Sequence, residues 1–343
     1  MSTVLRTSGG LSVRLRPRAL LVGLGCALVA LTVGVLAIGS GDYPMGPADV
    51  VRTLAGGGSA ADAFIVEQVR LPRVVTALLA GGGLALSGAV FQSLVRNPLG
   101  SPDVLGFTQG AATGALIAIV VAGGGGLAVA GGAVGGGLAT GAAIYALAWR
   151  HGLHGHRLVL VGIGVAAILT GVNGYLLTRA QITDAARAVL WLTGSLDGRG
   201  WDDAVPLLSA MAVTVPVVLG CGRGLRMLEM GDDAAHALGV PVERLRLMLM
   251  GAAVLLSACT AAAAGPVAFV ALTAPQLARR LTGTPGPNLL PSLCVGAALL
   301  VSADLVAQRL VPGHQLPVGV MTGMLGGAYL VWLLATERRA GRI

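Results

Sequence analysis

The sequence contains no lysine, few aromatic residues and few charges of either sign. All 23 basic residues among its 343 are arginines, aromatic residues make up 3% and charged residues 11%. A soluble domain usually has about 25% charged residues, so the composition excludes an ordinary soluble domain. Without lysine the chain also has no G-x-x-x-x-G-K-[ST] phosphate-binding loop. We therefore expect no catalytic residues and no ATP hydrolysis by this chain alone.

Cysteine and metal-binding patterns are scarce as well. The four cysteines lie in or beside apolar runs without C-x-x-C spacing (Cys26, Cys221, Cys259 and Cys294). Inert buried thiols are expected, rather than a metal site or a disulfide framework. Three histidines fall in "HGLHGHR", residues 151–157, which we interpret as a solvated basic loop rather than a metal site. The sequence thus predicts no metal and no cofactor on this chain.

Long apolar runs are the main positive feature. The chain is 55% apolar, and several of its stretches reach the roughly 20 residues that span a bilayer. Because backbone groups in lipid must be paired internally, these spans should be helices. The sequence predicts an all-α polytopic membrane protein with about ten transmembrane helices: 19–39, 71–92, 105–122, 127–149, 158–178, 204–222, 247–264, 268–280, 291–308 and 317–335. The eighth is short and follows Gly265-Pro266, so we expect a partial or broken helix.

The arginines predict the orientation. With the N-terminus inside, sixteen arginines fall in inner segments and seven in outer ones, so both termini should be cytoplasmic. The net charge of +8 reflects this rule rather than nucleic-acid binding. The first apolar run is longer than the apolar core of a secretory signal, so a retained span is expected. This divides the chain into a tail (1–18), one transmembrane domain (19–335) and a second tail (336–343).

Two glycine runs, residues 122–126 and 131–137, bracket the turn between the third and fourth spans. Small residues let transmembrane helices approach closely, and such runs can also act as hinges. We attribute these two runs to loose packing or compositional drift.

A polar stretch, "MLEMGDDAAHALGV" (227–240), interrupts the apolar pattern. Gly231 can end one short helix, and Asp232 can cap the next with Asp233 in its first turn. Gly239 can end that helix before Pro241 begins another. Helices this short need something to pack on. Spacing alone leaves two readings open: a loop on the lipid headgroups, or a docking surface for a soluble partner.

Five segments in order resemble one family. "MGDDAAHALGV" resembles "LGdxxAxxLGv", the coupling helices of the permeases of iron-siderophore and vitamin B12 ABC importers, the FecCD/BtuC type. "VRLPRVVTALLAGGGLALSGAVFQSLVRNPLGSPDVLGFTQGAATGA" (69–115) resembles the family's most recognisable block, and "WLTGSLDGRGW" (191–201) its W-x-x-G-S segment. "AGPVAFVALTAPQLARRLTG" (264–283) and "QLPVGVMTGMLGGAYLVWLL" (315–334) resemble its last two blocks. The resemblance covers about Ala19 to Leu334.

The resemblance implies a transport subunit in the bacterial inner or plasma membrane. A second permease chain, identical or paralogous, would pack beside it, and two ATPase subunits would bind ATP and Mg²⁺ below. An extracytoplasmic substrate-binding protein, possibly lipid-anchored, would dock above; no nucleic acid is involved. The coupling helices would lie at about 223–246, with a coupling surface formed by Gly231, Asp232, Asp233, Ala234, Leu238 and Gly239.

The resemblance also suggests docking and pathway residues. Arg70, Arg73 and Arg309 would pair with acids of the binding protein; headgroup anchoring is the alternative. The gate regions would include Gln109, Gly155 and His156.

Thr170 and Asn173 are polar groups in the fifth span. They either line the pathway or bond a neighbouring helix.

Asp304 is an acid inside the ninth span. We interpret it as a structural partner of a nearby polar group, although a proton relay in a stand-alone ion-coupled secondary transporter is the alternative. A membrane scaffold without transport is a third, less favoured class. Three residues depart from the family pattern: Gln276 for histidine, Ala271 for glycine and Gln315 for glutamate. Gln276 favours a ferric siderophore as substrate, with cobalamin or haem as rivals.

Overall fold

Each of the ten apolar stretches forms a helix in the computed structural model, which describes residues 3–6, 12–41, 43–150, 152, 155–311 and 314–339. Of these described helices, seven are long and apolar enough to cross a membrane, and residues 107–121 and 318–332 form shorter apolar helices. The main helices are α1 (Pro17–Gly39), α4 (Leu71–Val95), α5 (Phe107–Leu116), α6 (Gly126–Ala148), α7 (Gly155–Arg179), α9 (Trp201–Gly220), α12 (Val242–Ala264), α13 (Val270–Thr282), α14 (Leu289–Arg309) and α15 (Val318–Arg339).

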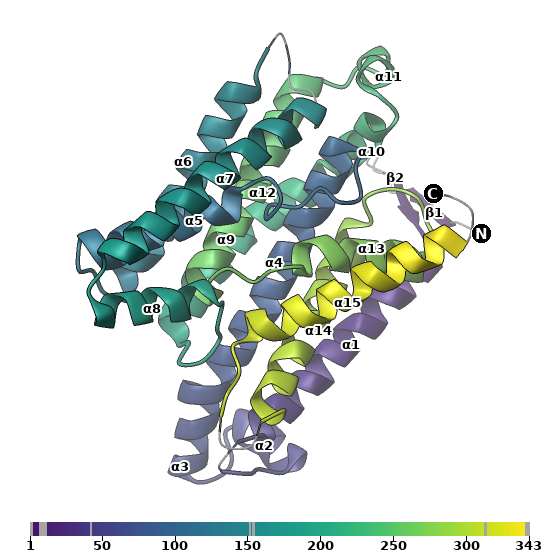
Figure 1. The fold of residues 1–343 in the computed structure, drawn as a ribbon. Coiled ribbons are helices and arrows are strands. Elements are labelled where there is room, and N and C mark those ends of the chain that lie inside the picture. The colour runs from purple at the N-terminus through teal and green to yellow at the C-terminus, as the bar shows by residue number, and fades with distance from the viewer. Residues whose placement is uncertain are drawn as a thin grey trace.

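Shorter elements connect these helices (Figure 1). They are α2 (Pro47–Leu54), α3 (Ala60–Ala63), η1 (Phe64–Arg70), η2 (Ile117–Val121), α8 (Ile182–Leu192), α10 (Gly222–Glu229) and α11 (Asp232–Ala237). The chain starts with an antiparallel hairpin of β1 (Thr3–Arg6) and β2 (Ser12–Leu15). The hairpin lies in the predicted N-terminal tail, and the bundle itself is all-α, as predicted. Within the bundle, η1 continues directly into α4.

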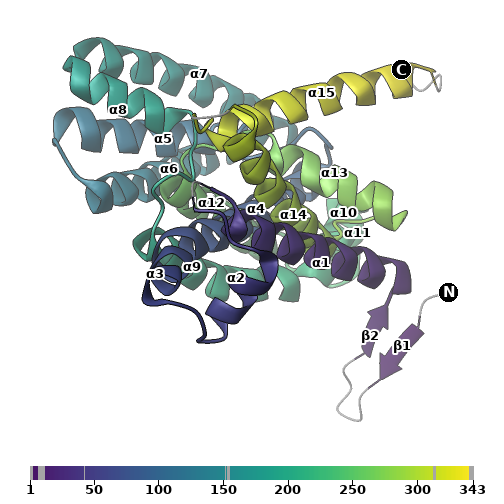
Figure 2. The same cartoon turned by 90° about the horizontal axis from the view of Figure 1, so that it is seen from below.

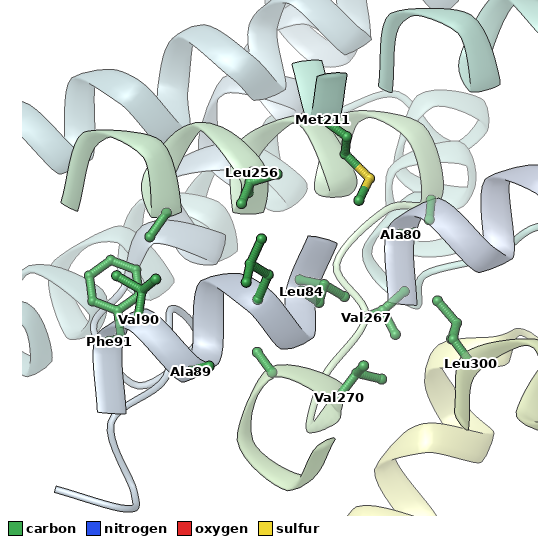
Figure 3. Close-up of a cluster of buried hydrophobic side chains, with 14 of the residues drawn as sticks. Ala80, Leu84, Ala89, Val90, Phe91, Met211, Leu256, Val267, Val270 and Leu300 are labelled. Atoms are coloured by element: carbon green, nitrogen blue, oxygen red, sulfur yellow. The ribbon is translucent and has the colours of Figure 1, made fainter. Parts of the chain in front are cut away.

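The core of the bundle surrounds α4, which is buried along most of its length. Figure 3 shows Leu84 of α4 among Leu256 of α12, Val270 of α13 and Leu300 of α14. Gly88 has no room for a side chain, because a Cβ there would overlap the backbone of Ala271. Small residues thus let α4 lie directly against α13, in keeping with helix packing in lipid.

Glycines also form the contact between α5 and α6. A Cβ on Gly114 would overlap the carbonyl of Gly132, and one on Gly136 would overlap that of Gly110. Our attribution of the 131–137 run to loose packing or drift is therefore wrong for Gly132 and Gly136, which permit a close backbone approach. It agrees with the structure at Gly135, where a Cβ would meet open space.

The bundle has two ends, which we name by the helices they hold. The α10–α11 end includes the start of α1, where Arg18 donates to the carbonyl of Leu281 at the end of α13 (3.0 Å). At the α2–α3 end, the Ser195 N–H donates to the carbonyl of Ala264 at the end of α12 (2.9 Å). Seen from the α2–α3 side in Figure 2, the α7–α8 pair and α15 extend to opposite sides of the bundle, and α1 runs alongside α14.

Two helices, α13 and α5, are too short to cross the membrane on their own. The eighth predicted span is indeed short: α13 has only 13 residues and follows the irregular segment 265–269. Residues 97–106, before α5, are also non-helical. At membrane depth, irregular backbone is tolerated only where protein or water surrounds it, so these segments mark places where function is to be sought.

Candidate coupling, docking and pathway sites

The loop after α9 folds as two short helices with sharp bends, as predicted. Gly231 joins α10 to α11 at a φ of 121°, and Gly239 follows α11 at a φ of 78°. L-residues with side chains rarely adopt these angles, so glycine is needed at both bends. Pro241 stands immediately before α12.

Asp232 has a different role from the one predicted. It is the first residue of α11 rather than its cap, and the cap position is held by Gly231. The Asp232 carboxylate accepts from Arg246 at 2.9 Å and also from Arg96. The side chain of Arg246 is only 4% exposed, so its charge requires a partner. Asp232 therefore links α11 by ion pairs to the end of α4 and to α12.

The outer face of this loop is apolar and acidic. Met230 is 63% exposed and Leu238 is 58% exposed, and Asp233 and Ala234 are exposed beside them. Ala235 faces inward and is fully buried. Figure 1 shows α11 projecting from its end of the bundle. A projecting surface with exposed apolar side chains is typical of a protein interface.

A polar network lies between this loop and α13. Ser93 of α4 donates to Glu229 of α10 (2.7 Å). The side chain of Gln92, on the preceding position, accepts from Arg279 of α13 (2.6 Å) and donates to the carbonyl of Leu272 (2.9 Å). The last turns of α4 thus contact both the α10–α11 loop and the short helix α13.

At the α2–α3 end, Arg73 and Asp304 form a buried ion pair. Two guanidinium nitrogens of Arg73 each lie 3.0 Å from an Asp304 oxygen, and Gln308 donates to the same carboxylate at 2.7 Å. The Asp304 side chain is 1% exposed and that of Arg73 is 13% exposed. The predicted structural role of Asp304 is confirmed. Arg73 is turned inward, and its docking role stays a prediction.

The other two predicted docking arginines differ in their surroundings. Arg70 donates to the carbonyls of Ile38 (2.7 Å) and Tyr43 (2.8 Å), so it ties the end of α1 to α4. Arg309 is exposed and donates to the Ser40 hydroxyl (2.7 Å). A cavity of about 450 Å³ lies beside Arg70 and Arg73 and opens at this end of the bundle. Of the three, Arg309 is the most accessible to a partner.

The α2–α3 connection beside this cavity is ordered by one carboxylate. Asp62 accepts from the N–H and the hydroxyl of Ser59 and from the hydroxyl of Tyr43. The hydrogen bond to Asp62 raises the pKa of the Tyr43 hydroxyl. Ser59 caps α3, and Asp62 completes a capping box by accepting from the Ser59 N–H.

The predicted pathway residues do not form one cluster. Asn173 donates to Gln109 (3.2 Å) and accepts from Thr113 (2.7 Å), so it joins α7 to α5 and is only 6% exposed. Thr170 is exposed on α7 and donates to its own helix.

Gly155 begins α7 at the α10–α11 end, where its Cα lies against the last turn of α4. His156 is exposed next to it. These placements give Gln109 and Asn173 a helix-joining role, and no observation tests a gating role for any of the five.

Sequence reasoning passed over Asp103. This residue lies in the irregular segment before α5, and its carboxylate accepts from the Thr108 hydroxyl at 2.6 Å. The only available signal was an acid at the border of an apolar span.

The residues that depart from the family pattern make specific contacts. Gln276 donates to the carbonyl of Pro98 (2.7 Å), and Gln315 accepts from Arg73 (2.7 Å). Among the described residues no group of three or more metal-ligating side chains is assembled. His151 and His154 lie outside the described residues.

Both the sequence and the fold of this chain are similar to those of known transport proteins. A sequence model described as the FecCD transport family matches residues 28–336. The ferric enterobactin transport system permease protein FepG of Escherichia coli K12 is 44% identical over 325 residues, 94% of this chain and 98% of that protein. The Fe(3+)-citrate import system permease protein YfmE of Bacillus subtilis is 34% identical over 333 residues, which are 95% of this chain and 98% of that protein. A metal-chelate type ABC transporter solved in an inward-facing conformation shares 27% identity with a TM-score of 0.80, over 92% of this chain and 99% of that one.

Proposed function

Because the chain belongs to the FecCD transport family, we propose that it is the permease subunit through which an ABC importer moves a ferric siderophore across the bacterial inner membrane. The observation that carries this proposal is the 44% identity, nearly end to end, with a ferric enterobactin permease. The fold and the loop after α9 support it, because a capped, projecting pair of short helices has no purpose without a partner.

The partners follow from the two ends of the bundle. The α10–α11 end would face the cytoplasm, with both chain termini, and contact two ATPase subunits that bind ATP and Mg²⁺. The α2–α3 end would face outward and receive a substrate-binding protein at Arg309, with Arg70 nearby. A second permease chain would complete the pathway. The exposed face of α7 supports that arrangement, since little of its apolar length is buried inside the bundle.

The rival substrate classes are cobalamin and haem. The siderophore reading is favoured because the similar proteins described above carry ferric enterobactin and ferric citrate. A stand-alone secondary transporter is no longer a useful alternative, since the family is one of ABC permeases. The acid on which that alternative depended, Asp304, is held by Arg73.

The proposal is tested by gentle purification of the chain from its native membrane, followed by mass spectrometry and by transport in proteoliposomes. We expect an ATPase and a lipid-anchored binding protein to co-purify, and ATP-dependent uptake of a radiolabelled ferric catecholate siderophore. Uptake of cobalamin or haem in its place would replace the substrate assignment. Reproducible isolation of the chain alone, under conditions that keep a known importer intact, would refute the importer assignment.

A Met230→Ser, Leu238→Ser variant tests whether the α10–α11 loop is the ATPase contact. Both side chains are exposed in this chain, so the variant should insert and fold normally. If the α10–α11 loop is the ATPase contact, the variant loses co-purifying ATPase. If it keeps the ATPase in full amount, the loop is not the docking surface.

A further inference from the structure

An apolar cavity of about 110 Å³ lies between α13, α14 and α15. Its wall includes one leucine from each of these helices, Leu277, Leu299 and Leu325. The threonines in the wall, Thr273 and Thr322, donate their hydroxyls to backbone carbonyls three or four residues earlier in the chain. These hydroxyls therefore require no hydrogen bond from an occupant. Apolar cavities of this kind exclude water and take up hydrocarbon.

Arg280 lies beside this cavity, towards the α10–α11 end of the bundle. It follows Leu277 by three residues on α13, so the two side chains share a helix face and are about 4.5 Å apart along the axis. The Cζ of Arg280 is 5.7 Å from the ring centre of Tyr329 and 5.0 Å from that of Trp332. Because Tyr329 also lines the cavity, the cation and the cavity share one wall.

The positive charge of Arg280 is not balanced by a carboxylate. Its side chain is exposed, and no ion pair in the described part of the chain includes it. A cation–π contact holds a guanidinium by its charge and its flat face, and leaves the N–H groups at its edge for hydrogen bonds. Such a planar fork of N–H groups matches the oxygens of a phosphate. Arg280 is therefore held in place with its donors directed to an anion.

Two arginines at the start of α1 add positive charge here. Figure 2 shows α13 between α1 and α15. Arg18 donates to the carbonyl of Leu281, the residue after Arg280, at 3.0 Å. Arg16 donates to the carbonyl of Pro285 at 3.3 Å. The end of α13 thus has cations from two helices around it.

The sequence around these cations contains almost no acidic residues. Residues 1–41 and 244–303, which include α1 and α13, contain no aspartate or glutamate. The helix α15 contains one acid, Glu337, which two arginines follow directly. The chain therefore supplies little negative charge at this place, and a ligand has to bring it. An occupant that matches both the cation and the cavity has an anionic head and a hydrocarbon tail.

We propose that the groove between α13 and α15 binds one acidic phospholipid, with its phosphate against Arg280 and part of an acyl chain in the cavity. The outer face of α15 supports a lipid as the occupant, because Met324 is 64% and Val331 is 70% exposed there. Arg280 stands in the last turn of α13, and basic pockets between the ends of transmembrane helices are suited to acidic headgroups. The site is separate from the transport function and requires only that the chain lies in a membrane.

The test measures quenching of tryptophan fluorescence in lipid vesicles. Replacing Trp149, Trp191 and Trp201 by phenylalanine leaves Trp332, which is 53% exposed, as the one tryptophan of the full chain. The vesicles are of phosphatidylcholine, with about a tenth of the lipid replaced by brominated phosphatidylglycerol or by brominated phosphatidylcholine. We expect about fivefold higher apparent affinity for the acidic lipid, the effect of one arginine near an acidic headgroup. Equal quenching by the two brominated lipids would overturn the proposal.

Variants separate this site from a general effect of surface charge. Arg280→Gln should abolish the preference for phosphatidylglycerol. The matched control is Arg150→Gln, because Arg150 is also exposed and follows α6 at the α10–α11 end, outside the groove; it should keep the preference in full. Equal losses in the two variants would contradict a specific site.

Leu325→Phe tests the cavity at constant charge. Leu325 lines the cavity and is 51% exposed, so a larger side chain there fills space without disturbing the core. We expect a lower affinity for phosphatidylglycerol, because the acyl chain loses its place. An unchanged affinity would show that the cavity holds no acyl chain, contrary to the proposal.

A salt titration needs no substitution in the groove and covers the case in which its variants do not insert. At about 1 M NaCl the Debye length is about 3 Å, so an ion pair with the exposed Arg280 is strongly screened. We expect the preference of the Trp332 protein for phosphatidylglycerol to fall steadily as salt is added. A preference that stays the same up to 1 M NaCl would overturn the proposal.

Discussion

Replacing Arg73 by alanine should destabilise the protein strongly, because it leaves a buried carboxylate without its cation. Asp304 is 1% exposed and receives two hydrogen bonds from Arg73, each 3.0 Å long. After the substitution only the bond from Gln308 would remain. Breaking a buried ion pair from one side costs about 3–5 kcal/mol. We expect the free energy of unfolding to fall by that amount.

The matched variants show whether this cost belongs to the pair. Asp304→Asn keeps the shape, and Arg73 keeps Gln315 (2.7 Å) and Asp197 (3.4 Å) as acceptors, so a loss of about 1–3 kcal/mol is expected. In the double variant Arg73→Gln, Asp304→Asn no charge is stranded. Its destabilisation should be smaller than the sum of the Arg73→Gln and Asp304→Asn effects by about 1–3 kcal/mol.

The assay is an unfolding titration in mixed detergent micelles, followed by circular dichroism. All four variants are measured beside the unsubstituted chain at one pH. Strict additivity of the Arg73→Gln and Asp304→Asn effects would refute the reasoning, as would a loss below about 1 kcal/mol for Arg73→Ala, the level of an exposed pair. Either result would leave Arg73 free to serve as a docking residue.

Three further outcomes are expected. Arg309→Glu should weaken binding of the substrate-binding protein about tenfold at low salt, since the Arg309 side chain is exposed and exposed charges act over about a Debye length. Unchanged affinity in a binding assay would show that Arg309 is not part of the docking site. Gly114→Ala should destabilise by about 1–3 kcal/mol through overpacking against Gly132, whereas Gly135→Ala, which faces open space, should change stability by less than about 0.5 kcal/mol; similar unfolding curves would contradict the packing argument. Asp304→Asn should keep ATP-driven uptake with the pH profile of the unsubstituted protein, and a steep pH-dependent loss would point to a proton relay.

The positions of the long helices could be predicted from the sequence because hydropathy is a local property. The stretch 71–92 became α4, Leu71–Val95, and the stretch 268–280 became the short α13, Val270–Thr282. The sharp bends at Gly231 and Gly239 were also predictable, since glycine is required there for backbone reasons alone. α2, α3 and α8 were missed because they are too short to give a span-length apolar signal.

Contacts between distant residues could not be predicted in the same way. Arg73 and Asp304 are 231 residues apart, and nothing in either neighbourhood names the other as its partner. The contact between Gln276 and the carbonyl of Pro98 likewise joins residues 178 positions apart. Similarly, Gly132 and Gly135 belong to one glycine run, but only the helix rotation shows that the first faces α5 and the second does not.

The shortness of α13 constrains the order in which the protein is made. Its 13 residues span about 20 Å, less than the roughly 30 Å of the hydrocarbon core, and its last turn holds Arg279 and Arg280. A newly synthesised segment of this kind gains little by entering lipid on its own. Its neighbour α4 leaves the ribosome about 175 residues earlier, a lead of roughly 10–35 s at ordinary synthesis rates. The short helix α13 can therefore enter the membrane beside α4, where Gln92 already offers a hydrogen bond to the Leu272 carbonyl, and does not have to cross bare lipid.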